Sequence, residues 1–134
     1  MAVGVLLMSH NHVGTELLNT ARQMLSCYSL PTKVISISTE DDRDVITQKL
    51  QQTLIETDQG QCILILTDMF GSTPSNIACD VSERHDIRIV SGLNLPMLIR
   101  VLNYPHLSLD ELEHKAITGG KEGVAQCHHT GCNP

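Results

Sequence analysis

The sequence has very few aromatic residues and no excess of positive charge. Aromatic side chains make up 2% of the 134 residues, and the three present are Phe70, Tyr28 and Tyr104. Proteins that bind single-stranded nucleic acid stack bases on several aromatic rings, and proteins that bind the phosphate backbone carry many basic side chains. Here 9 Lys and Arg stand against 15 Asp and Glu, a formal net charge of -6. We therefore expect no nucleic-acid partner.

Long hydrophobic runs and paired cysteines are also missing. No apolar stretch approaches the roughly 20 residues that span a bilayer. The first apolar run has no basic segment before it and no cleavage-like site after it. The cysteines form an odd set of 5, and Cys62 and Cys79 lie inside apolar segments, which favours free thiols over a disulfide framework. We expect a soluble, cytoplasmic protein that is not inserted in a membrane.

The chain is instead rich in aliphatic side chains arranged in alternating patterns. Hydrophobic residues make up 41% of the sequence, a content typical of buried parallel strands covered by helices. Strand patterns fall at residues 2–8, 32–38, 61–67 and 87–92, and helical patterns at 13–25, 41–57, 72–83, 94–104 and 108–124. The alternation predicts one α/β domain with a four-stranded parallel sheet and helices on both faces.

Several polar residues mark the expected helix starts. Ser72 or Thr73 is an N-cap candidate, because Pro74 follows at a first-turn position that tolerates proline. Ser108 and Glu111 have the spacing of a capping box. Thr15 or the loop before it is expected to cap the helix at 13–25.

Two of the predicted helices show apolar positions at helical spacing. In the helix at 13–25 these positions are Val13, Leu17, Leu18, Ala21, Met24 and Leu25. In the helix at 41–57 they are Val45, Ile46, Leu50, Leu54 and Ile55.

Polar residues follow three of the predicted strands. The first strand ends in Ser9 and His10, the third in Asp68, and the fourth in Ser91 and Gly92. In an open α/β sheet, ligands bind beyond the carboxyl ends of the strands, where the strand order reverses. We therefore expect these residues to meet at one edge of the sheet.

A histidine beside a carboxylate, as His10 and Asp68 would be, is a common arrangement for nucleophilic or acid/base catalysis. A carboxylate can accept one ring N–H of a histidine, which fixes the tautomer and leaves the lone pair of the other nitrogen free. We predict that His10 and Asp68 take these two catalytic roles.

The loop at 71–76 has the composition of an anion-binding segment. Gly71 allows close backbone approach, and Ser72, Thr73 and Ser75 offer hydroxyls beside the free N–H groups of a helix start. This loop would hold a phosphoryl group on a histidine, with no metal or other cofactor expected. Nothing in it resembles a Walker motif, so a nucleotide is not the obvious donor.

Two hypotheses from other functional classes are alternatives to a phosphorylated histidine. Ser9 or Ser72 with His10 and Asp68 would suggest a serine hydrolase, but no G-x-S-x-G elbow is present. At the end of the chain, "QCHHTGCNP" offers Cys127, His128, His129 and Cys132 as zinc ligands, although the spacing is irregular. A frayed, flexible terminus is the preferred interpretation of residues 126–134.

Three stretches together carry a family resemblance: "GVLLMSHNHVGTELLNTARQML", "LILTDMFGSTPSNIA" and "VSGLNLPMLIRVL". In order and spacing, residues 1–125 resemble the enzyme IIA component of the mannose-type sugar phosphotransferase system (PTS). The stretch "TDMFGSTPSN" is a specific signature of this resemblance. The phosphotransferase subunit of dihydroxyacetone kinase has a related fold, but the same stretch fits it less well.

The resemblance implies a flavodoxin-like fold, often with an edge strand exchanged in a homodimer. It implies that His10 accepts a phosphoryl group from the phosphocarrier protein HPr and passes it to a IIB component, as a phosphohistidine intermediate. The carboxylate that orients this histidine falls on Asp68, and the phosphate-holding loop on Gly71, Ser72 and Thr73. An alternative within the family is a free-standing regulatory IIA that reports the phosphorylation state of the system.

This sequence departs from the family pattern at two positions. Many members have a second glycine where Ser72 stands, so the loop gains a side chain here. His12 occupies a position where the family usually has no histidine, and we interpret it as a loop residue.

Overall fold

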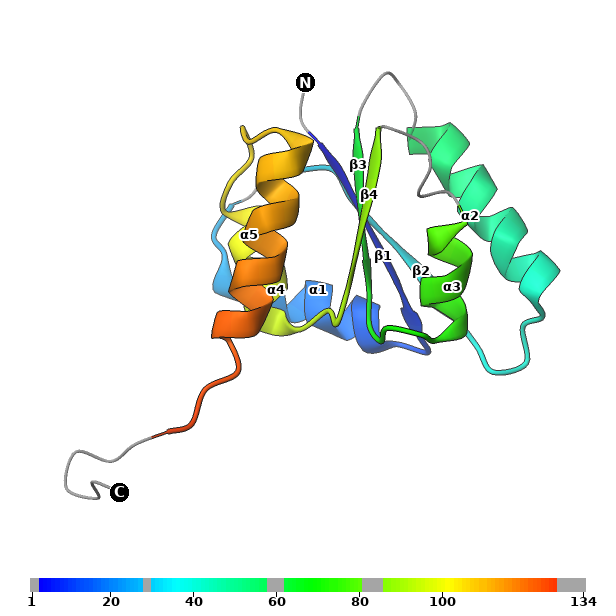
Figure 1. The fold of residues 1–134 in the computed structure, drawn as a ribbon, viewed down its shortest axis with the longest axis horizontal. Coiled ribbons are helices and arrows are strands. Elements are labelled where there is room, and N and C mark those ends of the chain that lie inside the picture. Colours follow the sequence, from blue (N-terminus) through cyan, green and yellow to red (C-terminus); the bar gives the residue numbers. More distant parts are fainter. Residues whose placement is uncertain (1–2, 28–29, 58–61, 81–85, 128–134) are drawn as a thin grey trace.

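A sheet of four parallel strands forms the centre of the molecule in the computed structural model, which describes residues 3–27, 30–57, 62–80 and 86–127. Its strands are β1 (Gly4–His10), β2 (Thr32–Ile37), β3 (Ile63–Thr67) and β4 (Ile87–Ser91). They lie in the order β2-β1-β3-β4, and every neighbouring pair is parallel (Figure 1). The predicted flavodoxin-like α/β fold is confirmed.

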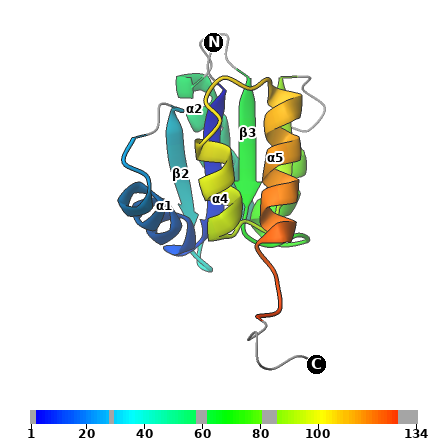
Figure 2. The same ribbon diagram turned by 90° about the vertical axis from the view of Figure 1, so that its left-hand side faces the viewer.

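Helices cover both faces of the sheet. One face carries α1 (Val13–Met24), α4 (Leu95–Leu102) and α5 (Leu109–Glu122), and the other carries α2 (Arg43–Thr57) and α3 (Thr73–Cys79) (Figures 1 and 2). Crossovers between parallel strands are right-handed. Because the strand order reverses after β2, the crossover helices before and after that point lie on opposite faces of the sheet.

Each face of the sheet has its own hydrophobic core, because successive strand side chains point to opposite faces. Leu7 and Leu66 pack on the side of α1, α4 and α5, whereas Met8 and Ile65 pack on the side of α2 and α3. All four side chains are fully buried. Each such burial contributes about 1.5–3 kcal/mol to the hydrophobic stabilisation.

Two of the three predicted helix caps form as expected. Ser72 caps α3, and Ser108 and Glu111 form a reciprocal capping box at the start of α5. The expectation for α1 is wrong in one respect, because Thr15 lies inside the helix and does not cap it. The backbone N–H of Gly14 donates instead to Oγ of Ser9, at 2.8 Å.

Four of the apolar residues in the two helical patterns are exposed. Val13 and Met24 on α1 are 44% and 62% exposed, and Val45 and Ile55 on α2 are 39% and 71% exposed. Adjacent helical residues point about 100° apart around the axis. Because Ile46 and Leu54 take the buried stripe of α2, their neighbours Val45 and Ile55 face away from the sheet.

The C-terminal segment falls mostly outside the described residues. Of the four candidate zinc ligands only Cys127 is described, and it is an exposed free thiol. Cys27, Cys62 and Cys79 are also free. Within the described ranges, no three His, Cys, Asp or Glu side chains are grouped to hold a metal ion.

No helix among residues 3–27, 30–57, 62–80 and 86–127 is long and apolar enough to cross a bilayer.

Candidate functional site

The carboxyl ends of β1 and β3 lie side by side at the point where the strand order reverses. Met8 pairs with Thr67 across these two strands, so the residues that follow each of them leave the same edge of the sheet. His10 is the last residue of β1, and Asp68 comes directly after β3. This edge is the general ligand-binding position of doubly wound sheets.

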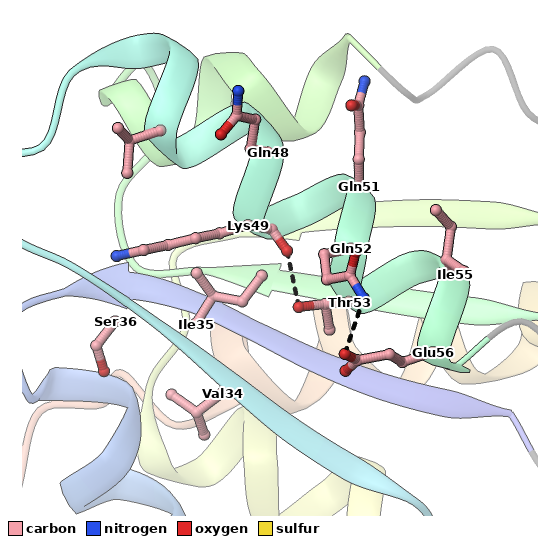
Figure 3. A pocket seen from close by; sticks show the side chains of 11 residues that line it. Val34, Ile35, Ser36, Gln48, Lys49, Gln51, Gln52, Thr53, Ile55 and Glu56 are labelled. Carbon is pink, nitrogen blue, oxygen red and sulfur yellow. Dashed lines mark hydrogen bonds between the residues drawn. The ribbon is translucent and has the colours of Figure 1, made fainter.

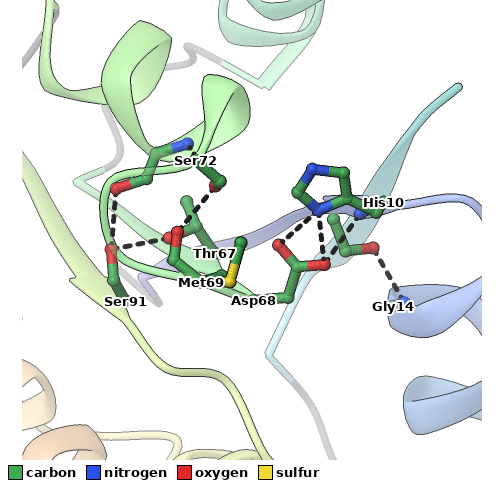
Figure 4. A network of polar contacts seen from close by, with 9 residues as sticks. His10, Gly14, Thr67, Asp68, Met69, Ser72 and Ser91 are labelled. Carbon is green, nitrogen blue, oxygen red and sulfur yellow. Dashed lines mark hydrogen bonds and ion pairs between the residues drawn. The ribbon is translucent and has the colours of Figure 1, made fainter. Parts of the chain in front are cut away.

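His10 and Asp68 contact each other through both the side chain and the backbone (Figure 4). Nδ1 of His10 lies 2.9 Å from Oδ2 and 3.1 Å from Oδ1 of Asp68. The backbone N–H of His10 donates to the same Oδ2, at 2.9 Å. The carboxylate thereby fixes both the position of the residue and the direction of its ring.

This contact assigns different roles to the two nitrogens of the ring. A carboxylate can only accept hydrogen bonds, so Nδ1 of His10 carries the proton that faces Asp68. In the neutral ring Nε2 then keeps its lone pair. The His10 side chain is 33% exposed and that of Asp68 is 12% exposed, so the ring is open to a partner while the carboxylate is shielded.

The turn after His10 is held in an uncommon conformation. Asn11 has φ of 49°, in the left-handed region that asparagine tolerates better than most residues. The Gly14 N–H bond to the buried hydroxyl of Ser9 closes the turn. His12 lies exposed within it, at the start of α1, and its side chain makes no capping hydrogen bond.

The loop after Asp68 turns at Gly71 and enters α3. Gly71 has φ of +80°, and a Cβ added there would meet no heavy atom within 4 Å. Ser72 is buried, and both its hydroxyl and its backbone N–H donate to the carbonyl of Met69, at 2.6 and 3.2 Å. Thr73 is exposed, and its hydroxyl has no hydrogen-bond partner in the part of the chain that the structure describes.

Two of the three expected anion-binding hydroxyls point elsewhere, that of Ser72, which donates to Met69, and that of Ser75. Ser75 was predicted to offer its hydroxyl to the loop, but this residue is 1% exposed and its Oγ lies 3.0 Å from Oγ of Ser91. The prediction is wrong because position 75 falls in the first turn of α3, on the side that packs against the sheet. Sequence spacing places the residue in the helix without fixing the direction of its side chain.

The two serines considered as hydrolase nucleophiles are both engaged away from the His10 ring. Oγ of Ser9 accepts the Gly14 N–H, and the hydroxyl of Ser72 donates to Met69. Nδ1 of His10 faces a carboxylate. The arrangement lacks the hydrogen bond between nucleophile and base that defines a catalytic triad.

Charge at this edge of the sheet is negative. The loop that follows β2 carries Glu40, Asp41 and Asp42, and β2 is the neighbour of β1. Hydrogen bonding to the backbone of Ser38, and then to Lys49, lowers the pKa of the Asp41 carboxyl. Asp41 is therefore ionised throughout the neutral range.

A broad open groove of about 780 Å³ lies away from the histidine, between β2 and α2 (Figure 3). Apolar side chains from both elements line it, including Val34, Ile35, Val45 and Ile55. Polar side chains of α2 close one side, where Gln52 donates to Glu56 at 3.1 Å. Neither His10 nor Asp68 lines this groove, so we place the candidate site at the strand ends.

Fold and site together define the class of protein. The chain is a doubly wound α/β protein, with a histidine and carboxylate pair at the switch point of its open parallel sheet. Residues 4–117 match the family EIIA-man, described as "PTS system fructose IIA component". The chain belongs to this family of phosphotransferase-system IIA components.

Individual relatives agree with this assignment. The chain is 27% identical over 127 residues to the mannose-specific EIIAB component of Escherichia coli K12, a match that covers 92% of this chain and 39% of that protein. Over 69 residues it is 35% identical to the fructose-specific EIIA component of Bacillus subtilis, covering 50% of this chain and 47% of that protein. The chain thus spans about two fifths of the length of the mannose-specific relatives.

Solved structures of similar proteins share the whole fold. The mannose/sorbose-specific IIA subunit of Enterococcus faecalis superimposes with a TM-score of 0.86 at 27% identity, covering 96% of this chain and 97% of that one. The phosphotransferase-system component EIIA of Streptococcus agalactiae gives 0.80 at 26% identity, covering 92% and 96%.

Proposed function

We propose that this IIA component is a phosphoryl carrier, which accepts a phosphoryl group on His10 from HPr and passes it to a IIB component. The free thiols favour the cytoplasm as its location. The observation that carries the proposal is the contact of Nδ1 of His10 with the Asp68 carboxylate, at 2.9 Å. It leaves Nε2 as the nucleophilic nitrogen on a partly exposed ring.

The proposed reaction moves one group between two nitrogens. The Nε2 lone pair of His10 forms a bond to phosphorus, while the bond from phosphorus to the donor nitrogen breaks and its electron pair returns to the donor ring. The proton on Nδ1 stays beside Asp68, which stabilises the positive charge that develops on the imidazole. Positioning and charge stabilisation supply most of the catalysis in such transfers. In the onward transfer, the IIB side chain forms a bond to phosphorus while the bond from phosphorus to Nε2 of His10 breaks, and its electron pair returns to the His10 ring.

The segment Gly71–Thr73 is the proposed phosphate-holding loop. The Thr73 hydroxyl and the backbone N–H of Gly71 supply donors, with open space beside Gly71. Ser72 shapes the loop by its two hydrogen bonds to Met69. A phosphoryl group carries about -1.5 to -2 charge at neutral pH, so donors of this kind are required around it.

Partner proteins would meet the ring over an apolar rim. Met69 and Phe70 directly follow Asp68 and are 58% and 83% exposed. Large exposed apolar side chains beside a reactive group are typical of protein contact surfaces. They support a protein, rather than a small molecule, as the donor.

The test is phosphorylation of the purified chain with enzyme I, HPr and phosphoenolpyruvate. We expect an acid-labile, alkali-stable adduct that His10→Ala abolishes. His12→Ala is the matched control, since it removes a histidine two residues away, and it should retain the adduct. An adduct that persists in His10→Ala and disappears in His12→Ala would overturn the assignment.

A further inference from the structure

A chain of side-chain hydroxyls lies beside the His10–Asp68 pair, and the proposed reaction does not use it (Figure 4). Oγ1 of Thr67 lies 2.7 Å from Oγ of Ser91, which lies 3.0 Å from Oγ of Ser75. Thr67 and Ser75 are 0% and 1% exposed, and Ser91 is half-buried. The three residues come from β3, α3 and β4, so the chain joins three elements.

Further hydrogen bonds connect the hydroxyl chain to Met69, the residue that follows Asp68 in the sequence. The backbone N–H of Ser75 donates to Oγ of Ser72, at 3.4 Å, and the Ser72 hydroxyl donates to the carbonyl of Met69, at 2.6 Å. Asp68 stands between Thr67 and Met69 in the sequence. The hydrogen bonds therefore form a closed ring through Thr67, Ser91, Ser75, Ser72 and Met69, with Asp68 as the covalent link.

A ring of this kind constrains the carboxylate from both of its chain neighbours. The carbonyl of Thr67 is held as well, because it accepts the N–H groups of Gly92 and Leu93, each at 2.9 Å. Buried hydroxyls that are fully hydrogen-bonded stabilise one arrangement, since any other leaves a polar group without a partner. The same ring sets the start of α3 and hence the loop at Gly71–Thr73.

We propose that Thr67, Ser75 and Ser91 are positioning residues, which hold Asp68 against Nδ1 of His10 and thereby keep the ring in its Nδ1–H tautomer. The part of this inference that concerns transfer rate rests on the proposed function. The part that concerns the tautomer does not, because the Asp68 contact exists in the unphosphorylated chain.

The experiment measures the ring nitrogens of His10 by ¹⁵N NMR in the full-length, unphosphorylated chain, alongside its rate of phosphorylation by phospho-HPr. Ser91→Ala is the main variant, because it removes the central hydroxyl and both contacts while changing one atom at a half-buried position. Thr67→Val removes one end of the chain and keeps the side-chain shape. Thr67→Ser keeps the hydroxyl and is the matched control.

We expect the wild type and Thr67→Ser to show the Nδ1–H tautomer. Ser91→Ala and Thr67→Val should show a mixture of both tautomers and transfer at least about tenfold slower, since small displacements of a reacting group cost factors of that order. Adding Ser75→Ala to Ser91→Ala should change little, because the ring is already open. Thermal unfolding verifies that each variant is folded.

The two proposals fail in different ways. A wild-type tautomer and rate in folded Ser91→Ala would overturn the positioning role, whatever the fate of the phosphoryl group. A mixed tautomer in Ser91→Ala, in a chain whose wild type accepts no phosphoryl group, would support the positioning role and overturn the proposed function.

Discussion

Among the residues that the structure describes, the imidazole of His10 makes its side-chain hydrogen bonds through Nδ1 alone. The residues that position it all lie within a few positions of the end of β1 or β3. The carboxylate of Asp68 takes Nδ1, and the turn closed by Ser9 and Gly14 sets the direction in which the chain leaves β1. On the proposed function, the contact with Asp68 therefore selects Nε2 of His10 as the reactive nitrogen.

Gly14 is a residue at which one added atom should disturb this turn. A Cβ on Gly14 would lie 2.5 Å from Oγ of Ser9, a contact that no side chain sustains. Overpacking of this kind costs about 1–3 kcal/mol. We expect Gly14→Ala to lower the free energy of unfolding by about that amount in urea titrations, despite the better helix propensity of alanine.

The double variant Ser9→Ala with Gly14→Ala is the control for that prediction. It removes the clashing oxygen, so its loss of stability should be smaller than the sum of the two single losses. If the loss in the double variant equals the sum of the two single losses, the contact between Cβ at position 14 and Oγ of Ser9 does not cause the destabilisation.

At the residue scale the sequence predicts positions better than directions. His10 and Asp68 could be placed together because both follow buried strands, and parallel strands end at one edge. The inward direction of Ser75 could not be predicted, since it depends on how α3 packs on β4. A signal was available in Thr67 and Ser91, which put hydroxyls at the last positions of two otherwise aliphatic strands.

At the scale of elements, strands and helices were predicted in the right order because their periods differ. The helical pattern leaves the direction open where two apolar residues adjoin, as at Val45 and Ile46 or at Leu54 and Ile55. Only one of each pair can face the sheet, and a second apolar residue is then left on the surface. The sequence pattern does not predict which residue of the pair faces the sheet, because that depends on how the helix is positioned over the sheet.

The capping box of α5 should make this helix sensitive to acid. Hydrogen bonding to Ser108, by its side chain and then by its backbone N–H, lowers the pKa of the Glu111 carboxyl. A lowered pKa in the folded state means that the stabilisation is present above the ordinary carboxyl pKa and is lost as the pH falls through the lowered value.

We therefore expect the wild type to have a higher melting temperature than Glu111→Gln near neutral pH, and the difference to shrink as the pH falls below the ordinary glutamate pKa and through the lowered value. Glutamine can still accept the N–H of Ser108 but does not titrate in this range. A difference in melting temperature that stays constant with pH would contradict the assignment of the effect to this carboxylate.

At the scale of the whole molecule, the described sheet has two edges, β2 and β4. Along β4 lies a groove of about 540 Å³, lined by Phe70, Ile87, Ile89 and Ile117 together with the charged residues Arg88 and Glu113. Exposed strand edges of this kind pair readily with another chain. We predict that a second copy of this chain pairs there, as the family resemblance implies.

Light scattering on the purified chain should then give twice the chain mass. If the contact between the two copies needs the chain beyond α5, a chain that ends at Gly123 should be a monomer. A truncated chain that keeps the doubled mass would place the contact elsewhere, and a full chain of single mass would exclude it.

His10 and Asp68 are 58 positions apart in the sequence, and only the pairing of β1 with β3 brings them together. During synthesis the histidine leaves the ribosome long before its carboxylate, and parallel pairing between distant segments is slow. On the proposed function, a nascent or half-folded chain would carry the histidine without the means to activate it. Only finished molecules would then compete for the cell's supply of phosphorylated donor.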